Sequence, residues 1–157
     1  MTAAHPNPIF RAADEVVLTG AMAIYDSQAD ASANIPKQWR TFLQAHPAMS
    51  NSKLYGASPC TSDNKIHYLT GIAQDATENL VAGERLTLVS GEYAFIRVDD
   101  PALLRDTWIW LLSTWLPNSG RREKNAPEFE RYTAVSETGS PIGPVEIWIP
   151  LEPIAAP

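Results

Sequence analysis

The feature that most restricts this sequence is an order of predicted elements that occurs twice. In the first half, an apolar, β-prone stretch from Glu15 to Tyr25 precedes a helical pattern and two further strands. The second half repeats strand, helix, strand, strand, and its helical pattern lies 69 residues after the first, which pairs Trp39 with Trp108. The strands that follow match at an offset of 77, which pairs Tyr55 with Tyr132. The sequence therefore predicts a duplicated β-α-β-β unit.

Spacing of apolar residues places the elements within each half. Positions i, i+4, i+7, i+8 and i+11 are apolar or aromatic in two stretches, Ile35, Trp39, Phe42, Leu43, His46 and Leu104, Trp108, Leu111, Leu112, Trp115. Pro36 fits the first turn of the first helix, which leaves residues 26–34 as a loop, and Asp100-Pro101 is typical of a helix start. The remaining strands are predicted at 53–57, 66–73, 84–89, 93–98, 129–134 and 145–150.

These elements predict one α+β domain at residues 14–157, preceded by a flexible lead-in at residues 1–13. The half-repeats span about 14–75 and 84–152. An antiparallel sheet with helices packed on one face would leave a central ligand cleft along the pseudo-twofold axis, because clefts between modules are favoured ligand sites.

Composition excludes several functions. The 157 residues carry 12 Lys and Arg against 18 Asp and Glu, a net charge of −6, and the longest basic cluster is Arg121-Arg122. Direct nucleic-acid binding is not expected, because that affinity comes from neutralised phosphates. No apolar run approaches the roughly 20 residues that cross a bilayer, and no secretory signal is visible, so we expect no membrane contact and a cytoplasmic location. The single cysteine, Cys60, cannot form an intramolecular disulfide or a Cys-based zinc site.

Six short segments, in this order, resemble the GyrI-like small-molecule-binding domain, which is also the effector-binding domain of AraC-type and MerR-type transcription regulators. The segments are Lys53-Leu54-Tyr55-Gly56, Ile66-His67-Tyr68-Leu69-Thr70-Gly71, Ser90-Gly91-Glu92-Tyr93-Ala94, Trp115-Leu116-Pro117-Asn118-Ser119-Gly120, Pro127-Glu128-Phe129-Glu130-Arg131-Tyr132 and Val145-Glu146-Ile147-Trp148-Ile149-Pro150. The resemblance spans about residues 16–151 and lacks a helix-turn-helix module. It implies a stand-alone effector-binding domain with a hydrophobic pocket, in which an acidic residue and aromatic walls receive lipophilic cations.

The resemblance implies that Glu130 is this acid. Alternation along the strand puts Glu130 and Tyr132 on one face, with Phe129 and Arg131 on the other. Trp148 is predicted to join Glu130 and Tyr132, because a carboxylate with aromatic rings suits a delocalised cation. Four further residues complete the predicted ligand-binding set, Tyr93, Tyr55, Tyr68 and Trp110. The alternative is that Glu130 is a solvated strand residue paired with Arg131 or Lys53. Trp39, Trp108 and Trp115 lie on the apolar faces of the two helices and are predicted to be core residues.

The predicted function is binding of lipophilic, drug-like cations, in transcriptional regulation or drug sensing. Two alternatives are a hydrolase of electrophilic toxins, with Glu130 beside Tyr132 or Tyr93 as general base, and a protein inhibitor of a larger enzyme such as a gyrase. The sequence has no recognisable catalytic motif, so we assign no catalytic residue, metal or cofactor. A homodimer and a separate protein partner both stay open.

Overall fold

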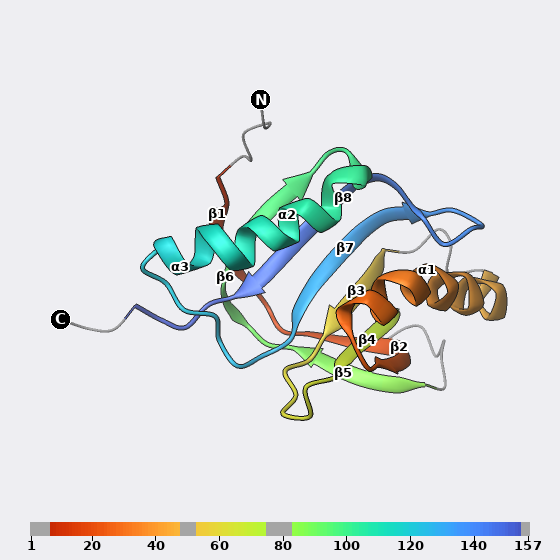
Figure 1. Cartoon of the computed structure of the whole chain (residues 1–157). Coiled ribbons are helices and arrows are strands. Elements are labelled where there is room, and N and C mark those ends of the chain that lie inside the picture. Colours follow the sequence, from red (N-terminus) through yellow and green to blue (C-terminus); the bar gives the residue numbers. More distant parts are fainter. Residues whose placement is uncertain (1–6, 48–52, 75–82, 155–157) are drawn as a thin grey trace.

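The computed structural model describes residues 7–47, 53–74 and 83–154. In these residues the chain forms one antiparallel sheet in the order β1-β6-β8-β7-β3-β4-β2-β5, with helices on one face (Figure 1). The elements are β1 Ile9–Ala13, β2 Val16–Tyr25, α1 Gln28–Ala45, β3 Leu54–Ser58, β4 Ile66–Ala73, β5 Glu84–Leu88, β6 Gly91–Val98, α2 Leu104–Trp110, α3 Leu116–Asn118, β7 Glu128–Val135 and β8 Pro141–Pro150. The predicted α+β class is confirmed.

The strand order has the symmetry that a duplication produces. Read outward from the central β3/β7 pair, one side runs β3-β4-β2-β5 and the other β7-β8-β6-β1. Each half therefore contributes a β-α-β-β unit, as predicted, and each half also has a leading strand that pairs with the other half. The leading strand β1 was not predicted, because the sequence analysis assigned residues 1–13 to a lead-in. Its five residues are mostly exposed, so they lack the alternating apolar pattern that marks a half-buried strand.

Helix α1 covers the first half of the sheet. Trp39 and Phe42, two of the residues on the predicted apolar face, are buried against Leu54 and Tyr68. The helix begins earlier than predicted, because the hydroxyl of Ser27 caps it by accepting a hydrogen bond from Asp30 N at 3.0 Å. Pro36 therefore lies inside the helix rather than in its first turn.

The second helical segment covers β6 and β8 on the same face of the sheet (Figure 1). Asp100 caps it, as predicted, by accepting from Ala102 N at 3.0 Å. The segment is not one continuous α-helix, because residues Leu111–Trp115 form a π-helical turn between α2 and α3. The wider turn shifts the helical face, so Leu111 is 1% exposed whereas Leu112, predicted to be buried beside it, is 39% exposed.

The opposite face of the sheet is also apolar. Its cluster joins residues of the first half, such as Leu69, to Tyr93, Phe129 and Trp148 of the second half. The link from β1 to β2 and the link from β5 to β6 are both short, yet each connects strands at opposite ends of the strand order. The two ends of the sheet therefore lie near each other, and the sheet is rolled around this cluster. No helix among the described residues is long and apolar enough to cross a bilayer.

Candidate ligand-binding site

Glu130 lies at the centre of the sheet, on β7, where it faces the helices. Its cross-strand neighbours are Gly56 of β3 and Ile147 of β8. In Figure 1, β7 runs between the two helical segments. Glu130 is 8% exposed, so the alternative of a solvated strand residue is wrong.

Three neutral groups donate hydrogen bonds to the Glu130 carboxylate. The hydroxyls of Tyr132 and Tyr68 donate to Oε1 at 2.7 and 3.0 Å, and the indole Nε1 of Trp108 donates to Oε2 at 2.8 Å. The donors come from β7, β4 and α2, so the sheet and a helix both hold the carboxylate in place. The two hydroxyls are 3.1 Å apart and complete the network.

No cationic side chain in residues 7–47, 53–74 and 83–154 pairs with this carboxylate. The ion pairs formed by the described residues all lie elsewhere, and none includes Glu130. Burial raises the pKa of Glu130 above its ordinary value, although the three donors oppose that rise. The same burial and the nearby carboxylate raise the pKa of Tyr68 and Tyr132 well above 10, so both hydroxyls keep their protons.

The helices place a tryptophan on each side of this network. Trp108 of α2 hydrogen bonds to Glu130, and Trp39 of α1 meets the ring of Tyr132 edge-on, with ring centroids 5.1 Å apart. The buried Nε1 of Trp39 has no hydrogen-bond partner of good geometry among the described residues, yet it lies close enough to the Tyr68 hydroxyl to oppose the rise of its pKa. The sequence analysis assigned both tryptophans to the core, although it had already paired them as counterparts in the duplication.

Gly56 makes room for the network. A Cβ atom at this position would overlap the hydroxyl of Tyr68, which lies directly above Gly56 on the helix face. The missing side chain is what lets the Tyr68 hydroxyl reach Glu130 on the neighbouring strand. We therefore count Gly56 as part of the site, although sequence analysis gave it no role.

A second, half-buried carboxyl group lies two residues before Glu130. Glu128 shares a hydrogen bond with Glu123, and its pKa is raised by burial first and by the Glu123 and Glu130 carboxylates second. Strand alternation puts Glu128 on the same face as Glu130. This part of the helix face therefore concentrates acidic groups, and the sequence analysis missed the Glu128–Glu123 pair.

A family model described as integron-associated effector binding protein, named Cass2, matches residues 12–151. The chain belongs to the Cass2 family. The predicted resemblance to GyrI-like effector-binding domains is confirmed by this match. No curated protein resembles the chain closely enough to count as a match.

Solved structures share the Cass2 fold of this chain. The structure of SAV2435 bound to tetraphenylphosphonium is 18% identical, with a TM-score of 0.76 over 94% of both chains. The integron cassette protein VCH_CASS2 from the mobile metagenome of Vibrio cholerae is 20% identical, with a TM-score of 0.71 over 93% of this chain and 96% of that chain. The C-terminal domain of EcmrR is 13% identical, with a TM-score of 0.60 over 94% of this chain and 98% of that domain.

The Cass2 fold of this chain does not bring all seven predicted site residues together. Tyr68 and Tyr132 contact Glu130, but Trp148 does not share its face, because the register pairs Glu130 with Ile147 and Trp148 with Phe129. Three of the predicted residues, Tyr55, Tyr93 and Trp148, belong to the apolar cluster on the opposite face. The register of β3 with β7 puts Tyr132 opposite Leu54, so Tyr55 and Tyr132 face opposite sides of the sheet. Tyr55 is therefore not the equivalent of Tyr132 in the duplication.

Trp110, the seventh predicted residue, packs half-buried against the cluster under α2. It lies two positions after Trp108 on the helix, about 200° around the axis at 100° per residue, so it does not point where Trp108 points. Among the described residues, no group of three or more His, Cys, Asp or Glu side chains could hold a metal ion.

Proposed function

We propose that this chain binds lipophilic cations on the helix face of its sheet, with Glu130 as the counter-charge. One observation carries the proposal: Glu130 is buried, hydrogen bonded by three neutral donors, and without a cationic partner in the part of the chain that the structure describes. Burying a carboxylate without a cation is costly, and a bound cation offsets that cost. The uncharged protein donors hold the carboxylate in position and leave its charge for the ligand.

The aromatic groups around Glu130 suit a delocalised cation. Tyr132, Trp39 and Trp108 lie within one network with the carboxylate. A cation over an aromatic face gains roughly 0.5 to 2 kcal/mol, depending on how fully it is desolvated. The ligand of SAV2435, tetraphenylphosphonium, belongs to this chemical class, which supports the proposal for a chain of the same fold.

Entry of a ligand requires a side chain to move, because Glu130 is already covered. Trp108 is the donor most suited to move, since it is only part-buried and comes from α2, whereas Tyr68 and Tyr132 are buried on central strands. The π-helical turn begins three residues after Trp108, and such turns weaken the regular hydrogen bonding of a helix. We propose that a cation replaces the indole N–H at Oε2 and keeps both tyrosine hydroxyls at Oε1.

The biological role that follows is sensing of drug-like cations in the cytoplasm. An effector-binding domain of this kind acts in transcriptional regulation through a separate DNA-binding partner, because its acidic surface does not favour direct contact with nucleic acid. Another protein would supply that DNA-binding partner, because a second copy of this chain carries the same net charge of −6.

The test is a fluorescence titration with tetraphenylphosphonium and with triphenylphosphine oxide, a neutral molecule of similar shape. The wild-type protein should bind the cation in the micromolar range and at least tenfold more tightly than the neutral molecule, a difference of about 1.4 kcal/mol. Glu130→Gln should remove this selectivity. The matched control is Glu146→Gln, which removes the same charge from the neighbouring strand on the other face. Equal binding of the two molecules by the wild-type protein would contradict the proposal.

A further inference from the structure

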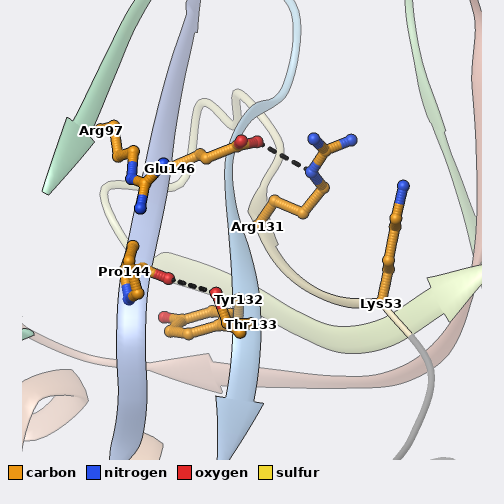
Figure 2. A pocket seen from close by; sticks show the side chains of 7 residues that line it. All are labelled: Lys53, Arg97, Arg131, Tyr132, Thr133, Pro144 and Glu146. Carbon is orange, nitrogen blue, oxygen red and sulfur yellow. Dashed lines mark hydrogen bonds and ion pairs between the residues drawn. The ribbon is translucent and has the colours of Figure 1, made fainter. Parts of the chain in front are cut away.

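The face of the sheet opposite Glu130 carries a groove that shares only one lining residue, Tyr132, with the cation site. The groove has a volume of about 420 Å³ and is lined by Lys53, Arg97, Arg131, Tyr132, Thr133, Pro144 and Glu146 (Figure 2). Arg131 pairs across the strands with Glu146, and Glu146 pairs with Arg97, so the three side chains share one face of β6, β8 and β7. Glu130 directly precedes Arg131 on β7, so its side chain points to the opposite face of the sheet.

The lining of this groove is positive in a chain whose net charge is −6. Three cations, Lys53, Arg97 and Arg131, face one carboxylate, Glu146. Arg97 also pairs with Asp99 at 2.9 Å, but that pair is largely exposed and therefore weak. The side chain of Lys53 forms no ion pair with any other residue that the structure describes. Basic residues are the minority in this chain, so their concentration here is not a consequence of composition.

Arg131 is the most firmly held of the three cations. Its Nε donates to Glu146 Oε1 at 2.8 Å, and its guanidinium lies 6.0 Å from the ring centroid of Trp148. The side chains of Arg131 and Glu146 are 32% and 23% exposed, so water screens this pair less than a surface pair. Figure 2 shows that the terminal nitrogens of Arg131 point away from Glu146 and toward the side of the groove that holds Lys53. A guanidinium edge of this kind binds carboxylates and phosphates through two parallel hydrogen bonds.

We propose that this groove is a second binding site, for a small organic anion that carries phosphate or carboxylate groups. Its volume lies in the range of small-molecule sites, about 300 to 1,000 Å³. Arg131 binds the anionic group, Lys53 adds a second charge from the facing side, and Arg97 contributes where the ligand extends along β6. Glu146 orients Arg131 and competes with the ligand for it.

Because Glu146 competes with the anion for Arg131, removing the cations and removing Glu146 should change anion affinity in opposite directions. Pyrophosphate and citrate serve as probes for phosphate and carboxylate groups, and binding is followed by calorimetry and by the amide NMR shifts of Thr133 and Glu146. Arg131→Gln and Lys53→Gln should each weaken binding of the preferred probe at least fivefold. Glu146→Gln should strengthen it, because the variant frees the guanidinium and raises the net positive charge of the groove. Thermal unfolding of each variant checks that it is folded.

The matched control is Arg105→Gln, which removes the same charge from an exposed position on α2. It should leave anion binding within twofold of wild type. Equal loss in Arg105→Gln and Lys53→Gln would show general attraction to positive charge and overturn the proposal. No saturable binding of either probe up to about 10 mM, or weaker binding by Glu146→Gln, would overturn it as well.

The anion site and the cation site are tested separately. Glu130→Gln should abolish cation selectivity and leave anion affinity unchanged, because the side chains of Glu130 and Arg131 face opposite sides of β7. Lys53→Gln should weaken anion binding and leave cation selectivity unchanged. Failure of the cation proposal therefore leaves the anion result intact, and failure of the anion proposal leaves the cation result intact.

Discussion

Cation binding is predicted to release a proton from Glu130, and this linkage follows from the burial of its carboxyl group. Burial raises the pKa of Glu130 in the free protein, so part of the population holds a proton at pH values above its ordinary pKa of 4.5. A bound cation stabilises the ionised form and lowers that pKa. Affinity for tetraphenylphosphonium should therefore rise as pH increases, until Glu130 is fully ionised without the ligand.

The structure sets the upper limit of this effect. One carboxyl contacts the proposed ligand position, and the phenols of Tyr68 and Tyr132 stay protonated because their pKa values are raised well above 10. At most one proton is therefore released for each bound cation, which corresponds to at most a tenfold change in affinity per pH unit, or about 1.4 kcal/mol. Affinity changes most steeply between the lowered pKa of Glu130 in the complex and its raised pKa in the free protein.

Calorimetry in two buffers of different ionisation enthalpy measures the protons released. Wild-type protein should release up to one proton per cation at pH values between the pKa of Glu130 in the complex and its raised pKa in the free protein, and Glu130→Gln should release none. Glu128→Gln is the necessary control, because Glu128 also has a raised pKa and faces the same side of the sheet. If the Glu128 variant loses the proton release and the Glu130 variant retains it, the assignment of Glu130 as the counter-charge is refuted.

Four further predictions test the site and the fold around it. Because the folded protein holds the Glu130 proton more tightly than the unfolded chain, the free energy of unfolding should fall as pH rises from about 4.5 through the raised pKa, and Glu130→Gln should reduce this slope in denaturant titrations. Trp108→Phe removes a donor to Oε2, so it should raise the pKa of Glu130 further and move the pH profile of cation affinity to higher pH; an unchanged profile would contradict the hydrogen bond. Gly56→Ala should displace the Tyr68 hydroxyl and cost about 1 to 3 kcal/mol of stability, measured by denaturant unfolding, and a neutral result would mean that the hydroxyl moves freely. Ser27→Ala should cost about 1 kcal/mol in the same assay by removing the cap of α1, without altering cation affinity.

The architecture could be predicted from the sequence because the duplication repeats its strongest local signals. Helical spacing around Trp39 and Trp108 located both helices, and the alternation in the 145–150 strand identified the apolar face that packs under α2. The start of α1 was missed because residues 28–34 are small and polar, and Pro36 suggested a later start. The π-helical turn could not be predicted, because periodicity assumes 3.6 residues per turn throughout.

Half of the candidate site was also within reach of the sequence. Strand alternation correctly placed Glu130 and Tyr132 on one face, but it cannot say which face of a neighbouring strand adjoins them, since that depends on register. Trp148 was therefore predicted on the face of Glu130, whereas the register places its neighbour Ile147 there. The contact between Trp108 and Glu130 spans a helix and a strand, and the absent side chain of Gly56 matters only once Tyr68 lies above it.

The crystal structure of this protein with tetraphenylphosphonium tests the central claim most directly. The account predicts that the phosphonium lies on the helix face within the Glu130 network, with the Trp108 indole displaced from Oε2 and both tyrosine hydroxyls still at Oε1. A cation bound among Tyr93, Phe129 and Trp148 on the opposite face, with the hydrogen bond from Trp108 to Glu130 intact, would contradict it.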